Sequence, residues 1–148
     1  MAANCRFAFG VHLLSVLALF PDENYSSDKL ALTVNTNAVV IRRMLLDLKN
    51  AGLVETQRGP GGGTRLAKPA THITLADIHH AVAGEIETFG SHPNPPAQVC
   101  VVGREIEGVL HDVSQRAAAA VEREFAAITL ADVAAQMRTT ADGKCRAV

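Results

Sequence analysis

Paired cysteines and aromatic residues are scarce in this chain of 148 residues. The three cysteines, Cys5, Cys100 and Cys145, lie far apart without a CxxC spacing, so neither a disulfide framework nor a zinc ribbon is indicated. Aromatic residues make up only 4% of the chain while hydrophobic residues reach 48%, so the core must consist mainly of Ala, Val, Leu and Ile. This composition favours one domain of packed helices with an added dimerisation element.

The apolar stretch near the N-terminus is too short to cross a membrane. It covers residues 7–20 and is interrupted by Gly10, His12 and Ser15, whereas a membrane span needs roughly 20 residues. No small-residue cleavage site follows it, as a secretory signal peptide would require. We therefore expect a protein of the reducing cytoplasm with no membrane partner.

Positive charge is not in excess overall, but it is unevenly distributed. The formal net charge is −1, a value that by itself does not suggest a nucleic-acid binder. Residues 1–68 carry eight Lys and Arg against five Asp and Glu, whereas residues 69–148 carry six against ten. The split indicates one half that meets phosphates and one half that does not.

Apolar periodicity predicts three helices in the first 50 residues. The first covers residues 6–20 and ends at Pro21, and a short second helix begins near Ser27, which can cap it. A polar turn at residues 35–37 precedes the third helix. In that helix an apolar stripe with the spacing i, i+3, i+4 and i+7 faces the core, and it consists of Ile41, Met44, Leu45 and Leu48.

A glycine-rich hairpin is predicted directly after these helices. Gly52 is placed to end the third helix in the left-handed conformation. Residues 53–57 and 64–67 fit two short strands, and the sequence Arg-Gly-Pro-Gly-Gly-Gly at residues 58–63 joins them with a flexible, cationic tip. Short helix, turn, longer helix and hairpin form a winged helix-turn-helix, so the predicted fold class is mainly α with a small β-hairpin wing.

A repeated pentapeptide and one long helix organise the second half. Ile-Thr-Leu-Ala-Asp occurs at residues 73–77 and 128–132, and each copy predicts a helix start with Thr as N-cap. Three prolines at residues 90–96 indicate a linker. A long helix over residues 103–127 carries an apolar stripe that needs a partner, and a second copy is the simplest one. The residues expected in this dimer interface are Ile106, Val109, Leu110, Val113, Ala117 and Val121.

These features divide the chain into four expected parts. Residues 1–84 form the winged helix-turn-helix DNA-binding domain, and residues 85–102 form a linker that is also a candidate sensing loop. Residues 103–137 comprise the dimerisation helix and a C-terminal helix. Residues 138–148 are expected to be a flexible tail.

Three consecutive motifs resemble those of the Rrf2 family of bacterial regulators. They are Leu-Leu-Asp-Leu-Lys-Asn-Ala-Gly-Leu-Val at residues 45–54, the glycine-rich loop at residues 58–63, and Ile-Thr-Leu-Ala-Asp-Ile at residues 73–78. The resemblance covers about residues 6–135 and is closest to the cluster-free YwnA-like branch. It implies a homodimeric transcriptional regulator, a repressor rather than an activator, and not an enzyme.

The resemblance also implies how such a dimer reads a double-stranded DNA operator. The third helix would enter the major groove, where Asn can pair with adenine, Arg with guanine or phosphate, and Val with a thymine methyl group. The wing would lie against the minor groove, where glycines allow close approach of the backbone and a guanidinium enters the narrow groove. The residues expected to contact DNA are Asn37, Val39, Val40, Arg42, Arg43, Arg58, Gly59, Pro60, Gly61, Gly62 and Arg65.

A bound iron–sulfur cluster is not expected, although many family members hold one through three cysteines. Cys100 is the only cysteine in residues 82–105, so a cluster would need Cys5, Cys145 or a second subunit. Cys100 alone is either a redox-sensing thiol or a buried apolar residue. No other cofactor is predicted.

Two other classes of function stay open, and the effector is not identified. One is a small-ligand or metal sensor with its pocket between residues 89–101 and the wing domain. A metal site is disfavoured because the neighbours His79 and His80 would point about 100° apart on a helix. The other is a protein-interaction module without DNA affinity. The glycine-rich loop is not a nucleotide loop, because it lacks the Gly-Lys-Ser/Thr ending and lies between strands.

Overall fold

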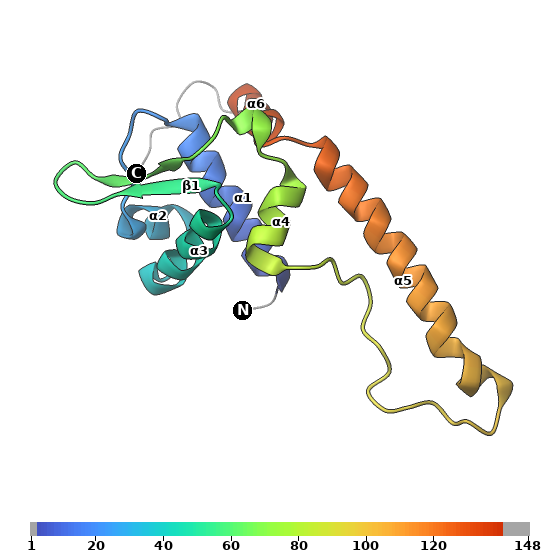
Figure 1. The fold of residues 1–148 in the computed structure, drawn as a ribbon. Helices are drawn as coiled ribbons and strands as arrows, with labels where there is room; N and C mark the ends of the chain where they lie inside the picture. The colour runs from blue at the N-terminus through green and yellow to red at the C-terminus, as the bar shows by residue number, and fades with distance from the viewer. Residues whose placement is uncertain (1–2, 141–148) are drawn as a thin grey trace.

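Figure 1 shows helices and a hairpin gathered into one body, from which a single long helix extends as an arm. This computed structural model describes residues 3–140, so Cys145 and the rest of the expected tail after Thr140 lie outside the described residues. Arg138 to Thr140, expected in that tail, belong to the last helix. The elements are α1 (Ala3–Leu19), α2 (Ser27–Val34), α3 (Ala38–Asn50), β1 (Val54–Gln57), β2 (Gly63–Leu66), the 3-10 turn η1 (Ala70–His72), α4 (Leu75–Ala83), α5 (Val101–Ala127) and α6 (Leu130–Thr140).

Helix α1 is central to the body because it is apolar on nearly every side. A helix of this kind is stable only when other elements cover it. Helices α3, α4 and α6 pack against α1, and α2 and the hairpin complete the core around them. Each fully buried Leu, Ile or Met contributes about 1.5–3 kcal/mol relative to an exposed one. The largest of these buried side chains are Leu13, Leu14, Leu30, Ile41, Met44, Leu48, Leu53, Ile73, Ile78 and Leu130.

The predicted hairpin is present and is fixed to the body by Tyr25. Strands β1 and β2 pair antiparallel, with Val54 opposite Leu66. The Thr64 N–H donates to the carbonyl oxygen of Tyr25 at 2.9 Å, so the loop after α1 adds one bridge to the hairpin. Gly63 is required at this point, because an added Cβ would lie 2.8 Å from the Tyr25 nitrogen. The wing is therefore held at a fixed angle to the helices.

The two copies of the repeated pentapeptide begin α4 and α6, as predicted, and they also pair with each other. Thr74 and Asp77 form a reciprocal capping box, and Thr129 and Asp132 repeat it. The backbones of the two copies form an antiparallel bridge, in which Leu130 N–H donates to the Ile73 carbonyl oxygen at 2.8 Å. The repeat thus joins the starts of two helices that are far apart in the sequence.

The arm, α5, is attached to the body near its C-terminal end. The rings of Phe7 and Phe125 stack with their centroids 4.9 Å apart. His80 Nε2 and a Glu122 carboxylate oxygen lie 2.8 Å apart, and the hydrogen bond to Glu122 raises the pKa of His80. The helix begins at Val101, two residues before the expected start. No helix within residues 3–140 is long and apolar enough to cross a membrane.

Arg6 joins three helices of the body. Its Nε donates to the carbonyl oxygen of Val82 at the end of α4, and its Nη2 donates to the Asp47 carboxylate of α3. The Val82 oxygen is one of the carbonyls that a helix end leaves without an intrahelical partner. Arg6 is also mostly buried, with 23% of its side chain exposed. The position of α3 in the body therefore depends partly on this one guanidinium.

We expect Arg6→Ala to lower the free energy of unfolding by about 1–2 kcal/mol, because Asp47 and the Val82 carbonyl lose a shared donor. Urea denaturation followed by circular dichroism measures this change. Arg65→Ala is the matched control, since it removes only an exposed ion pair with Glu55 and should cost no more than about 0.5 kcal/mol. Equal losses in the two variants would show that Arg6 has no special structural role.

Candidate nucleic-acid interface

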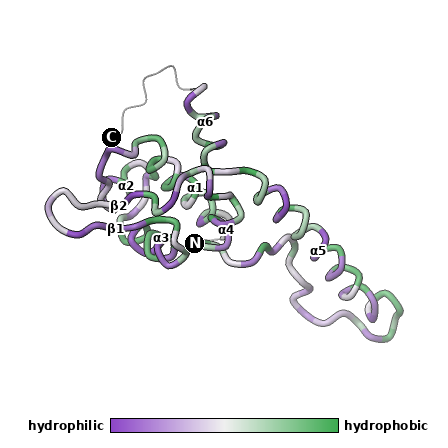
Figure 2. Tube along the Cα trace, turned by 45° about the horizontal axis from the view of Figure 1, so that its top comes forward, coloured by the Kyte–Doolittle hydropathy of each residue, from purple (hydrophilic) through white to green (hydrophobic). Residues whose placement is uncertain are grey.

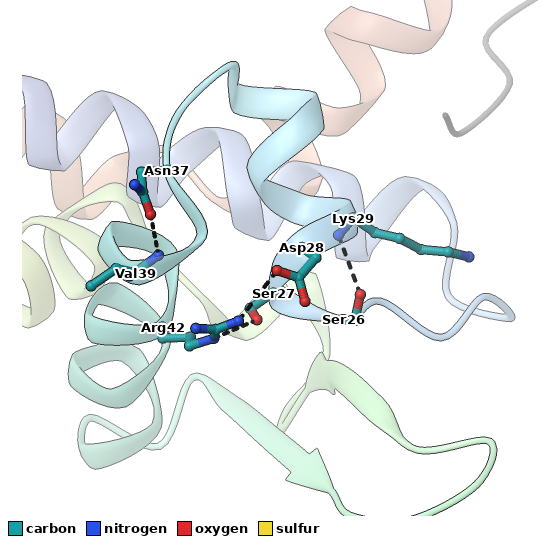
Figure 3. Close-up of polar contacts among 7 residues, drawn as sticks. All are labelled: Ser26, Ser27, Asp28, Lys29, Asn37, Val39 and Arg42. Carbon is teal, nitrogen blue, oxygen red and sulfur yellow. Dashed lines mark hydrogen bonds and ion pairs between the residues drawn. The ribbon is translucent and has the colours of Figure 1, made fainter.

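Two asparagines set the turn between α2 and α3. Asn35 ends α2 in the left-handed conformation, with φ of 57°, and its N–H donates to carbonyl oxygens in the last turn. Asn37 begins α3, and its side-chain oxygen accepts from the Val39 N–H at 2.8 Å (Figure 3). Asn is favoured in both roles because it tolerates the left-handed region and caps helix N-termini. Asn37 was predicted as a base contact, and here its oxygen is occupied as a cap.

Burial of one side of α3 determines what the other side presents. The predicted stripe of Ile41, Met44, Leu45 and Leu48 is buried. Val39, Arg42 and Arg43 are consequently exposed, as a groove-reading helix requires. Val40 differs from these three, because it is partly buried and packs against the core. Val40 was predicted to contact DNA, but it does not belong to the exposed face of α3.

The two arginines of α3 differ in their surroundings. Arg42 reaches back to α2, where its Nη2 lies 3.2 Å from an Asp28 carboxylate oxygen and its Nε donates to the Ser27 hydroxyl at 3.1 Å (Figure 3). Both members of this ion pair are exposed, so its contribution to stability is small and a phosphate can compete for the arginine. Arg43 has no hydrogen bond or ion pair with any described residue. Its guanidinium is free to contact a base edge.

Loop geometry explains the glycines of the wing. Gly59 and Gly61 have positive φ values of 97° and 75°. At Gly62 an added Cβ would lie 2.3 Å from the Gln57 carbonyl oxygen. The tip is therefore a tight turn, in which the backbone conformation disfavours side chains at Gly59 and Gly61 and a close carbonyl oxygen excludes one at Gly62.

The two arginines of the wing also differ. Arg58 is exposed and forms no ion pair with any residue in the described range. Arg65 lies opposite Glu55 across the strands and pairs with its carboxylate, so part of its charge is neutralised. Arg58 is therefore the stronger candidate for a minor-groove contact.

A shallow cleft of about 390 Å³ separates α3 from the wing. Arg42 lines it from α3 and Arg58 lines it from the wing. Lys49, Ser27 and Thr56 also line this cleft, and sequence reasoning missed them. Lys49 could have been found, because it lies seven residues after Arg42 and so on the same side of α3.

The linker side of the structure corrects two expectations. Cys100 is exposed, so the interpretation of it as a buried apolar residue is wrong. Its sulfur caps α5 by accepting from the Gly103 N–H at 3.2 Å. The pocket expected between residues 89–101 and the wing domain is instead a hollow of about 380 Å³ between residues 89–92 and α5.

The predicted interface residues of the long helix lie on its open side. Val109 and Val113 are 56% and 45% exposed, and Leu110 is also exposed. Ile106, Ala117 and Val121 are half-buried. Figure 2 shows apolar and polar positions alternating along α5, which extends away from the body. The structure of a single copy thus leaves this stripe without a complete packing partner.

Comparison with known proteins finds transcriptional regulators and DNA-binding proteins among the relatives of this chain. Residues 3–136 match the Rrf2 family model, described as an iron-dependent transcriptional regulator. The HTH-type transcriptional regulator YwnA of Bacillus subtilis (strain 168) is 37% identical over 130 residues, which cover 88% of this chain and 95% of YwnA. The crystal structure of a DNA-binding protein is 33% identical, with a TM-score of 0.69, and the match covers 86% of this chain and 97% of that chain. CymR of B. subtilis, the global cysteine regulator, shares the fold with a TM-score of 0.65 at 23% identity over 88% of this chain and 94% of its own.

Two variants of Asn37 test its role as a helix cap. Asn37→Ala should lower the free energy of unfolding by about 1 kcal/mol, because the Val39 N–H loses its acceptor. Asn37→Asp should retain the stability, since a carboxylate accepts the same hydrogen bond and is favourable at a helix N-terminus. Urea titration of both variants gives the comparison. If the alanine variant is as stable as the wild type, the cap is energetically unimportant.

Proposed function

The chain belongs to the Rrf2 family of transcriptional regulators, and on this basis we propose that it binds operator DNA in the cytoplasm as a homodimer and represses the genes beside the operator. One observation carries the proposal. Helix α3 turns an exposed face with Arg43 toward solvent, next to a wing that carries Arg58, and neither arginine forms an ion pair with a residue of the described range 3–140. Repression requires only that the bound dimer occupies DNA that polymerase needs.

The geometry supports a division of labour between α3 and the wing. Arg43 can form two hydrogen bonds to a guanine edge, and Val39 can contact a thymine methyl group in the major groove. Arg42 and Lys49 border the cleft beside α3, where phosphates of one strand would lie, and Arg58 would enter the minor groove from the wing. The glycines at the tip of the wing allow its backbone to approach the sugar-phosphate wall. Sequence would thus be read by α3, and affinity would come from the surrounding cations.

A homodimer supplies the second recognition helix that an operator with two half-sites requires. The exposed apolar stripe of α5 supports this part of the proposal, because exposed Val109, Leu110 and Val113 on one helix are costly in water. In a dimer with two-fold symmetry the same surface patch is buried on both copies. The two copies of α3 would then face the same side of the DNA.

The residues of one described chain do not fit an iron–sulfur cluster. A cluster needs several thiolate or imidazole ligands around one point. Within residues 3–140, no three His, Cys, Asp or Glu side chains come together as a metal site. The described cysteines, Cys5 and Cys100, belong to α1 and to the start of α5 respectively. We therefore propose regulation without a cluster, although the family description mentions iron.

We further propose that the signal acts where the linker meets α5. The exposed Cys100 thiol is accessible to oxidants there, and its sulfur makes the hydrogen bond that begins the helix. The hollow between residues 89–92 and α5 offers a place for a small ligand at the same junction. Either a redox signal or a small ligand would act on the dimerisation arm and, through it, on the spacing of the recognition helices.

Single substitutions of Arg43 and Arg58 should have different effects on DNA binding. Arg43→Ala should cost about 1–3 kcal/mol on the preferred operator and much less on random DNA, because it removes a base contact. Arg58→Ala should weaken operators with A/T pairs under the wing and spare those with G/C pairs, because the guanidinium reads groove potential.

Fluorescence anisotropy on matched operators across a salt series measures both effects. Arg104→Ala is the control, since it removes one positive charge from α5 and not from α3 or the wing. Equal, sequence-independent losses for Arg43→Ala and Arg58→Ala would reduce both residues to phosphate contacts. Unchanged binding in both variants would refute the proposed interface.

The dimer interface is tested by charge in the apolar stripe. Val109→Asp with Val113→Asp should produce a monomer, because carboxylates without partners would be buried in the seam. Sedimentation velocity gives the mass, and Gln115→Asp on the opposite side of α5 is the control. An unchanged dimer in the double variant would exclude this interface.

A further inference from the structure

An apolar pocket of about 550 Å³ lies between α1, α6 and the start of α4. Its size is typical of sites for small molecules, which measure about 300–1,000 Å³. Val16 and Leu19 of α1, Leu75 of α4 and Val133 of α6 are among the nine apolar residues that line it. The residues that the structure places along its wall include no Lys, Arg, Asp or Glu. Such a pocket therefore favours an uncharged, mainly apolar occupant.

Ser15 supplies a polar group that the folded chain leaves without a partner. The residue lines the pocket, only 3% of it is exposed, and its buried hydroxyl oxygen makes no hydrogen bond with any described residue. Buried polar groups are nearly always paired, because an unpaired one loses its bonds to water without replacement. Rotation about the single Cα–Cβ bond can turn a serine hydroxyl toward a neighbouring cavity. A ligand that brings its own polar group into the pocket would supply the missing partner.

His12 lies one turn before Ser15 on the same side of α1 and also lines the pocket. Burial lowers the pKa of its imidazole, so the ring is uncharged at neutral pH. An uncharged imidazole has one nitrogen that donates a hydrogen bond and one that accepts. Together with the serine hydroxyl it suits a ligand hydroxyl group, which also both donates and accepts. An ionised ligand would find no opposite charge in this pocket to replace its hydration.

The pocket shares its wall with the elements that hold the arm. Phe7 lines the pocket, and its ring stacks on Phe125 of α5 with the centroids 4.9 Å apart. Val133 and Met137 line it from α6, which begins three residues after α5 ends. Figure 1 shows the arm joining the body beside α6. A ligand that favours one spacing of α1 and α6 would therefore favour one position of α5, and with it one spacing of the recognition helices in a dimer.

We propose that this pocket binds an uncharged apolar molecule with one hydroxyl group, a phenol being the simplest example, and that the bound molecule is an effector of DNA binding. The hydroxyl pairs with Ser15 and His12, and the ring lies among the apolar side chains between α1 and α6. The pocket shares no lining residue with the hollow at the linker or with the cleft beside α3. The effector role rests on the DNA binding proposed above, whereas the binding of the phenol does not depend on it.

Titration of the full chain with 2-naphthol in a calorimeter tests the site, because this phenol is uncharged at neutral pH. One molecule should bind per chain, and naphthalene-2-sulfonate, which has the same rings with a negative charge, should bind about tenfold more weakly or less. Ser15→Ala should weaken the binding of 2-naphthol by about threefold to tenfold, because one hydrogen bond to the ligand is lost. The same variant should unfold at the same or a higher urea concentration, since it removes an unpaired buried hydroxyl.

A larger side chain in the wall tests where 2-naphthol binds. Val133→Trp should abolish binding by filling the pocket, and Val99→Trp, on the exposed linker, is the control that should leave binding unchanged. Circular dichroism checks that both variants are folded. Binding that survives Val133→Trp in the folded protein would overturn the site. Equal binding of 2-naphthol and the sulfonate would overturn its chemistry.

Fluorescence anisotropy with operator DNA selected by the protein tests the effector role. Saturation with 2-naphthol should change the operator dissociation constant by about threefold or more in the wild type and should not change it in Val133→Trp. An unchanged constant in a chain that binds 2-naphthol would overturn the effector role and leave the DNA binding standing. A chain that prefers no DNA sequence would overturn the proposed function and the effector role together, and the calorimetric titration would still decide whether the pocket binds a phenol.

Discussion

Burial of one side of α3 in the core, mainly against α2 and α4, is the constraint from which the rest of the structure follows. Ile41, Met44 and Leu48 are fully buried, so α3 cannot rotate without exposing them to water. That fixes which residues remain outside, and they include Val39, Arg42, Arg43 and Lys49. Arg6 then fixes the helix through Asp47, and Tyr25 holds the wing beside it. A recognition surface results because the core leaves no other orientation for its residues.

The arm, α5, also depends on the burial of apolar side chains. The body encloses its own core, so among residues 3–140 the elements of the body leave much of the apolar stripe on α5 uncovered. Phe125 and Glu122 attach α5 to the body near one end of the helix, while Val109 and Val113 remain exposed farther along it. A stripe of this kind is suited to a second copy of the chain. Two recognition helices would then be joined by elements that are rigid because they are helical.

The sequence predicted the features that depend on local patterns. The buried stripe of α3, the hairpin, the capping Thr74 and Thr129, and the left-handed Gly52 all appear where spacing and residue type indicated. Long-range features were not accessible in this way. The bridge between the repeated pentapeptides joins residues more than 50 positions apart, and neither copy carries a local sign of it. The exposure of Cys100 depends on where the linker runs, and the capping role of Asn37 depends on where the helix begins.

The central claim is that the chain recognises particular DNA sequences as a dimer through α3 and the wing. Selection of genomic DNA fragments by the purified full-length protein at physiological salt, followed by sequencing, tests it most directly. The account predicts enrichment of fragments that share a pseudo-palindromic site, with half-sites separated by about one helical turn, or 10 base pairs, or a multiple of it. Fragments bound in proportion to their length, without any shared site, would contradict it.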